Sequence, residues 1–143
     1  MATSMNDELT QATNLQQLGN EVKRSGRPLL LLFTQEHCDY CHRLKEEIFL
    51  PMNRNAAERE RVLIREVSID LGNEITYFDG TVEEGYLFFK EYGLFVTPTV
   101  ILLDSTGTQI GKPLLGANTL EMYGWYLDVA IDDARQTILA NQK

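Results

Sequence analysis

The strongest constraint on the fold lies where an apolar run meets the chain's two cysteines. Residues Leu29 to Phe33 are all large and apolar, which is typical of a buried β-strand. Cys38 and Cys41 follow, and the apolar residues after them, Leu44, Ile48 and Phe49, recur at helical spacing. The sequence therefore predicts that Cys38 lies at a strand-to-helix junction, beside backbone amides that have no partner within the helix.

This position favours a reactive sulfur. The partial positive charge at a helix N-terminus stabilises a thiolate and lowers the pKa of the thiol, and the thiolate is the attacking species in disulfide exchange. Cys41 lies one turn along on the same face, within reach of a mixed disulfide at Cys38. A C-x-x-C pair beside a βαβ pattern is typical of a redox pair. We therefore expect a thiol–disulfide oxidoreductase, with nucleophilic Cys38 and resolving Cys41.

Composition limits the other classes of function. The chain has 143 residues, of which 43% are hydrophobic, which suits one globular domain. Its formal net charge is −8 without a Lys/Arg cluster, so we expect no nucleic-acid partner. The longest apolar run has five residues, far short of the ~18 needed to span a bilayer. Residues 1–8 do not resemble a secretory signal, so we expect either a cytoplasmic protein or a mature chain whose signal was removed. We also expect a monomer.

The remaining pattern predicts the element order α-β-α-β-α-β-β-α. After a flexible N-terminus over residues 1–12, a first helix should end before Gly26, and the cysteine helix should end near Leu50-Pro51. Thr81 and Glu84 fit a capping box that opens a later helix. The other expected elements are a helix or turn over 53–61, strands over 62–69 and 95–103, a hairpin partner over 108–110, and a last helix capped by Asn118 with core candidates Leu120, Tyr123, Leu127, Ile131 and Ile138.

Pro98 conflicts with the strand pattern around it. A proline in a central strand removes a hydrogen-bond donor and is not expected there. A cis Thr97–Pro98 bond at the start of the strand would resolve the conflict, and a trans proline at an edge strand is the alternative.

Together these features resemble the thioredoxin superfamily. The resemblance covers roughly residues 29–131 and rests on the apolar strand, C-x-x-C at a helix start, Thr-Pro before a strand, and a hairpin followed by a final helix. In more detail the chain resembles the SoxW-type bacterial periplasmic thioredoxins. The segments that carry this finer resemblance are Ile69-Asp70, Phe78-Asp79-Gly80, Tyr92-Gly93-Leu94, Thr97-Pro98-Thr99 and Asp104-Ser105-Thr106-Gly107.

The resemblance implies an α/β thioredoxin fold over residues 13–143, with a central mixed β-sheet and helices on both faces. It implies that Pro98 is cis and packs beside the cysteines, and that the Thr97 backbone pairs with an extended partner segment. The Thr97 hydroxyl would touch the sulfur, and Tyr40 would lie at the rim of the groove. The implied protein is a periplasmic reductase that needs no cofactor beyond the Cys38–Cys41 disulfide. Its implied partners are sulfur-oxidation or cytochrome-maturation proteins.

The sequence also departs from ordinary thioredoxin. His37 replaces a tryptophan, Asp39-Tyr40 replaces Gly-Pro, and Leu32 replaces a buried aspartate that assists proton transfer at the resolving cysteine. Glu66 or solvent would have to take over that task. His37 and His42, when protonated, would lower the pKa of the Cys38 thiol, whereas Glu36 and Asp39 would raise it. These opposing charges leave open whether the protein oxidises or reduces.

Three other classes use the same residues. Cys38-x-x-Cys41-His42 is also the attachment pattern of c-type haem, with Met52 or Met122 as a possible second ligand. A zinc site would need both cysteines with His37 and His42, which would be strained unless a dimer shared the metal, so we expect no metal. A non-catalytic binding module of the same fold typically lacks one of the cysteines.

Overall fold

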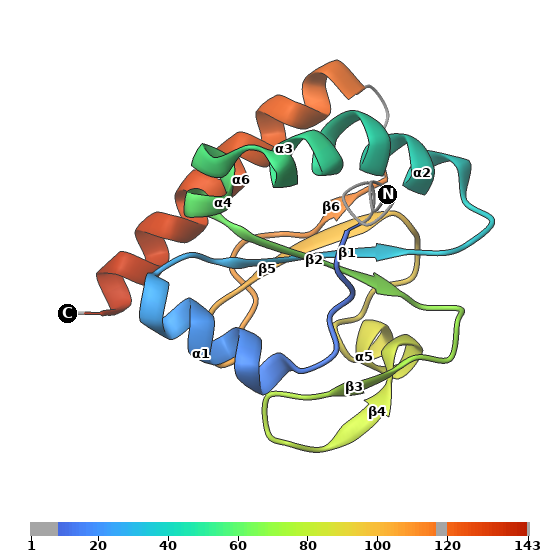
Figure 1. Ribbon diagram of the computed structural model, residues 1–143, viewed down its shortest axis with the longest axis horizontal. Helices are drawn as coiled ribbons and strands as arrows, with labels where there is room; N and C mark the ends of the chain where they lie inside the picture. The colour runs from blue at the N-terminus through green and yellow to red at the C-terminus, as the bar shows by residue number, and fades with distance from the viewer. Residues whose placement is uncertain (1–8, 117–119, 143) are drawn as a thin grey trace, which may run out of the picture.

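The computed structural model describes residues 9–116 and 120–142, and its centre is a mixed four-stranded sheet (Figure 1). The strand order is β2–β1–β5–β6, with β1 at Leu29–Thr34, β2 at Leu63–Ser68, β5 at Thr99–Leu103 and β6 at Leu114–Leu115. β1 runs parallel to β2 and antiparallel to β5. All six residues of β1 are buried because the strand is central and is covered on both faces, which explains its continuous apolar run.

Helices cover both faces of this sheet, as the resemblance implies (Figure 1). One layer holds the cysteine helix and α6, and the other holds α1 and α5. The helices are α1 (Leu15–Ser25), α2 (Asp39–Leu44), a π-helical segment (Lys45–Phe49), α3 (Leu50–Arg54), α4 (Ala56–Arg61), α5 (Gly85–Glu91) and α6 (Leu120–Asn141). The chain therefore has the predicted α/β thioredoxin fold, and no described helix is both long and apolar enough to cross a membrane.

Alternate residues of β1 face the two layers. Leu29, Leu31 and Phe33 pack with Leu15 of α1 and Phe88 of α5. On the opposite face, Leu30 and Leu32 pack against the cysteine helix and α6. The predicted α6 core residues Tyr123, Leu127, Ile131 and Ile138 are buried, while Leu120 is partly buried. Asn118, the expected cap of α6, lies outside the described residues.

The prediction that the cysteine helix ends near Leu50-Pro51 is wrong. The chain stays helical through Pro51 to Arg54. The reason is the π-helical segment, in which the N–H of Leu50 bonds to the carbonyl of Lys45, five residues earlier. Pro51 then falls in the first turn of α3, where the missing N–H of proline costs no backbone hydrogen bond of that helix.

The predicted capping box is also wrong. Both the N–H and the hydroxyl of Thr81 donate to the Asp79 carboxylate, at 3.0 and 2.7 Å. Residues Val82–Glu84 form β4, which pairs antiparallel with β3 (Glu74–Thr76) beside the main sheet. Helix α5 starts only at Gly85. Tertiary pairing therefore overrides the local helix signal.

Two boundaries differ from the predicted ones. The regular strand after the turn at 104–107 is β6, whereas residues 108–110 contribute only an isolated bridge between Leu103 and Gln109. At the N-terminal side, Gln11 bridges to Glu66 of β2, and Leu9 and Ala12 are buried. The packed part of the chain therefore includes residues 9–12 as well as those from residue 13 onward.

Candidate active site

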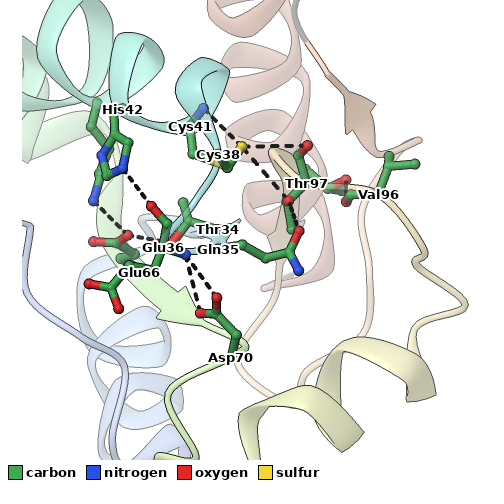
Figure 2. Close-up of a disulfide and its surroundings, with 12 residues drawn as sticks. Thr34, Gln35, Glu36, Cys38, Cys41, His42, Glu66, Asp70, Val96 and Thr97 are labelled. Atoms are coloured by element: carbon green, nitrogen blue, oxygen red, sulfur yellow. Dashed lines mark hydrogen bonds and ion pairs between the residues drawn. A yellow bond between two sulfur atoms is a disulfide. The ribbon is translucent and has the colours of Figure 1, made fainter.

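Cys38 is the N-cap residue of α2, at the end of the loop that leaves β1 (Figure 2). Its backbone is extended, and its sulfur accepts a hydrogen bond from the N–H of Cys41 at 3.2 Å. The two cysteines form a disulfide. The structure thus confirms the strand-to-helix placement of Cys38. An amide of the first helical turn that has no partner within the helix donates to its sulfur instead.

The two cysteines differ in access to solvent. Cys38 is partly exposed, whereas the exposed fraction of Cys41 is 0%. A protein thiol or disulfide can approach the sulfur of Cys38 from outside, but it cannot reach that of Cys41. The geometry therefore suits an exchange in which Cys38 meets the partner and Cys41 acts only within the chain.

The loop before Cys38 is held in place by two polar contacts. The N–H of Glu36 donates to both carboxylate oxygens of Asp70, at 3.0 and 3.3 Å. The carbonyl of Glu36 accepts from Nε2 of His42 at 2.8 Å. Because a carbonyl can only accept, His42 carries its proton on Nε2 in this arrangement. Asp70 was expected only as part of a family motif, so its role in fixing this loop is a finding of the structure.

Thr97 lies against Cys38, although they are 59 residues apart in the sequence (Figure 2). The Thr97–Pro98 peptide bond is cis, and Pro98 is buried. The Thr97 carbonyl oxygen lies 3.8 Å from the Cys38 sulfur, and the Thr97 hydroxyl oxygen lies 3.9 Å from it. That hydroxyl also donates to Oε1 of Gln35 at 2.8 Å. We did not predict a role for Gln35, because nothing in its sequence context distinguishes it from a solvated polar residue.

Glu66 is a buried carboxylate on β2, with an exposed fraction of 3%. It pairs in register with Leu32, the position where ordinary thioredoxin has its buried aspartate. Its Oε2 accepts hydrogen bonds from the Thr34 hydroxyl at 2.5 Å and from the Lys45 ammonium at 3.0 Å. Lys45 follows Cys41 by one helical turn, and that i,i+4 spacing is the signal that sequence reasoning missed.

A cavity of about 280 Å³ joins this buried carboxylate to the cysteine loop. It is lined mainly by polar side chains, among them Thr34, Gln35, Glu36, His42, Lys45 and Glu66. A polar cavity of this size has room for water. The site thus holds a buried carboxylate with a polar route toward the active-site loop.

The other predicted site residues are exposed around the disulfide. His37, Asp39 and Tyr40 all lie on the surface at the start of α2, and the Arg43 guanidinium stands 6.0 Å from the centre of the Tyr40 ring. No described hydrogen bond joins His37 or Asp39 to either sulfur. Across residues 9–116 and 120–142, no three His, Cys, Asp or Glu side chains come together as a metal site would require.

Comparison with known families decides the assignment. Residues 15–131 match the family profile described as a thioredoxin-like domain. The chain belongs to the thioredoxin-like domain family. With its C-x-x-C disulfide, this thioredoxin-like protein is a thiol–disulfide oxidoreductase. No curated protein sequence matches the chain.

Solved structures confirm the fold of this thioredoxin-like protein. Mitochondrial thioredoxin 3 from Saccharomyces cerevisiae is 22% identical, with a TM-score of 0.58 over 87% of this chain and 94% of that one. A thioredoxin-fold protein from Helicobacter pylori is 21% identical, with a TM-score of 0.56 over 80% and 81%. The DsbD C-terminal domain from Neisseria meningitidis is 19% identical, with a TM-score of 0.56 over 85% and 99%. At these identities the likeness concerns the fold alone.

Proposed function

We propose that this protein reduces disulfides of partner proteins, with Cys38 as the nucleophile and Cys41 as the resolving thiol. The observation that carries the proposal is the asymmetry of the pair: Cys38 is accessible at a helix N-terminus, whereas Cys41 is fully buried. Thiolate character and access together determine which cysteine attacks.

The reaction proceeds in two exchanges. The Cys38 thiolate attacks one sulfur of the partner disulfide, forms a mixed disulfide and releases the partner's other sulfur as a thiolate. Cys41 then loses its proton and attacks the Cys38 sulfur. This step forms the Cys38–Cys41 disulfide and releases the second partner thiolate, so two electrons pass to the partner. A neighbouring reductant of the dithiol class must restore the pair.

The partner is expected to dock beside Thr97 and Pro98. The Thr97 backbone precedes β5 next to Cys38, so an extended partner segment can pair with it as an added strand. Tyr40 lies exposed next to Cys41 in the sequence and is proposed to form the rim of this docking site. Docking there places the partner disulfide next to the only sulfur of the pair that it can reach.

Glu66 is proposed as the proton acceptor for Cys41. It is the buried carboxylate beside Leu32, and its cavity also reaches Gln35, Glu36 and His42 of the active-site region. The cavity lining includes the carboxylate but neither cysteine, so water would have to carry the proton from the thiol to the cavity and on to Glu66. His37, Asp39 and His42 are proposed to tune the Cys38 thiolate by their charges, since all three adjoin the pair in the sequence.

We propose no cofactor beyond the disulfide itself. Haem attachment would require the Cys41 sulfur to reach a porphyrin edge and a ring nitrogen of His42 to bind iron. Cys41 is fully buried, and His42 Nε2 donates to the carbonyl of Glu36. The geometry therefore favours disulfide exchange. A Soret band in the purified protein would contradict this choice.

The finer assignment is a monomeric, SoxW-type periplasmic reductase serving sulfur-oxidation or cytochrome-maturation proteins. It is supported by the motif segments at 69–70, 78–80, 92–94, 97–99 and 104–107. The reduction potential tests the direction of the reaction, because thioredoxin lies near ~−270 mV and the oxidant DsbA near ~−120 mV. A value close to that of DsbA would contradict a reductase.

Insulin reduction with dithiothreitol as electron donor tests the function itself. The wild type should accelerate precipitation of the insulin B chain, and Cys38→Ser should not. Equal rates for the two proteins would refute the proposal. The Cys41→Ala variant should accumulate a mixed disulfide with insulin, whereas Cys38→Ala should trap nothing. The reverse pattern would exchange the two roles.

A further inference from the structure

The Thr97 hydroxyl stands between two possible acceptors. Its oxygen lies 2.8 Å from Oε1 of Gln35 and 3.9 Å from the Cys38 sulfur (Figure 2). A threonine hydroxyl has a single proton to donate, so it can serve only one of them at a time. In the disulfide form the amide oxygen holds that proton, because it is near and a disulfide sulfur is a weak acceptor.

Reduction changes the balance between the two acceptors. The Cys38 thiolate carries a full negative charge, and hydrogen bonds to charged acceptors are roughly twice as strong as neutral ones. The hydroxyl can turn its proton toward the sulfur by rotating about its Cβ–Oγ bond, because the sulfur lies 3.9 Å from the same oxygen. The Gln35 amide oxygen then loses its partner. Gln35 therefore favours the disulfide form over the thiolate form.

Gln35 is held where it can exert this effect. The residue before it, Thr34, is buried at the end of β1, and the residue after it, Glu36, has its N–H fixed by Asp70. Its own side chain is exposed, lines the polar cavity beside Glu66, and makes no described hydrogen bond other than that with Thr97. A change at Gln35 should therefore alter the hydroxyl without disturbing the core.

We propose that Gln35 is a positioning residue that sets the stability of the Cys38 thiolate by competing for the proton of the Thr97 hydroxyl. This inference rests on the proposed function in that Cys38 is taken as the attacking thiol. It goes further because Gln35 belongs neither to the C-x-x-C pair nor to the Thr97–Pro98 segment, yet would influence the redox equilibrium.

The test compares Gln35→Ala with the wild type in the full-length, reduced protein. The acid dissociation constant of the Cys38 thiol is measured from the pH dependence of its alkylation by iodoacetamide, and the redox equilibrium is measured against glutathione. A net hydrogen bond is worth about 0.5–1.5 kcal/mol, so both constants should shift by roughly threefold to tenfold toward the thiolate and the dithiol. An unchanged or raised pKa of the Cys38 thiol would overturn the proposal.

A double-mutant cycle shows whether the effect passes through the hydroxyl. Thr97→Val removes the hydroxyl, so adding Gln35→Ala to it should change neither constant. Thr97→Ser retains the hydroxyl, so adding Gln35→Ala should again lower the pKa of the Cys38 thiol. An equal effect of Gln35→Ala in the Thr97→Val background would refute the proposed route. Gln136→Ala, at an exposed position of α6, is the matched control and should leave both constants unchanged.

These measurements are independent of any protein substrate. A protein that fails to reduce insulin would contradict the proposed function, yet its Cys38 thiol could still be titrated and the role of Gln35 decided. Conversely, normal insulin reduction with an unchanged pKa of the Cys38 thiol in Gln35→Ala would overturn this inference and leave the proposed function intact.

Discussion

The Lys45 ammonium donates a hydrogen bond to the Glu66 carboxylate at 3.0 Å, one helical turn beyond Cys41. Glu66 is buried on β2, whereas the Lys45 side chain keeps about a quarter of its surface exposed, at 24%. The Thr34 hydroxyl completes the cluster from β1. This ion pair and the Thr34 hydrogen bond therefore tie the helical segment that follows Cys41 to both parallel strands, β1 and β2.

Loss of Lys45 should destabilise the protein more than neutralisation of Glu66. Lys45→Met leaves a buried carboxylate without its cation, and such losses cost about 3 kcal/mol or more in buried sites. Glu66→Gln keeps the shape and the hydrogen bond with Thr34, and it leaves a lysine that can turn toward solvent. Urea unfolding at neutral pH measures both changes. Lys23→Met, an exposed helix position, is the control, and equal stability of Lys45→Met and Lys23→Met would contradict the account.

Glu66→Gln should also slow the resolving step. An amide cannot take up the Cys41 proton, and general-base assistance contributes about a hundredfold or more to a rate. The mixed disulfide at Cys38 should therefore persist at least roughly tenfold longer than in the wild type when a rapid acid quench is analysed by mass spectrometry. Glu83→Gln, which neutralises an exposed carboxylate, should have no such effect. A mixed disulfide as short-lived in Glu66→Gln as in the wild type would exclude Glu66 as the proton acceptor.

Two helical glycines should respond in opposite ways to alanine. A Cβ at Gly19 of α1 would lie 2.4 Å from the backbone carbonyl of Ser105, which cannot move as a side chain can. A Cβ at Gly124 of α6 would meet nothing within 4 Å. Alanine is favoured over glycine in a helix by about 1 kcal/mol. Thermal unfolding should show that Gly124→Ala is stabilised by up to that amount and Gly19→Ala is destabilised. A stabilised Gly19→Ala would show that α1 can move away from Ser105.

The sequence predicted the elements whose burial pattern and local chemistry agree. The run Leu29–Phe33 became the central strand because every side chain in it is buried. Cys38 became a helix N-cap, and Gly26 ended α1 in the left-handed conformation that favours glycine. At these positions the local sequence pattern and the tertiary packing favour the same backbone conformation.

The sequence failed where a distant segment decides the outcome. Thr81–Glu84 has a helix-start signal, but pairing with β3 makes most of it a strand. Pro51 has a helix-stop signal, but the π-helical segment carries the helix past it. Lys45 and Gln35 became part of the site only through contacts with Glu66 and Thr97, which lie on other elements. The sequence places Lys45 one helical turn after Cys41, but it carries no record that Lys45 contacts Glu66 or that Gln35 contacts Thr97.

Tyr92 links α5 to the turn before β6 and gives a prediction at alkaline pH. Its hydroxyl donates to the carbonyl of Gly107 at 2.5 Å. Burial raises the pKa of Tyr92 to about 12, with smaller contributions from the charges of Glu91 and Asp104. An unfolded tyrosine ionises near ~10, so the folded state binds this proton more tightly. The stabilisation is therefore complete below about pH 10 and is lost as the pH rises toward 12.

Tyr92→Phe removes the ionisable group and with it this part of the pH dependence. At about pH 8 the variant should be less stable by about 1 kcal/mol, because one hydrogen bond is lost. Between about pH 8 and about pH 11 its urea midpoint should fall less steeply than that of the wild type, since the unfolded variant no longer gains from ionisation at this residue. Burial also raises the pKa values of Tyr77 and Tyr123, so the urea midpoint still falls with rising pH in both the wild type and Tyr92→Phe. Tyr86→Phe, at an exposed position, should retain the wild-type slope. If Tyr92→Phe and Tyr86→Phe have the same slope, Tyr92 does not bind its proton more tightly in the folded state.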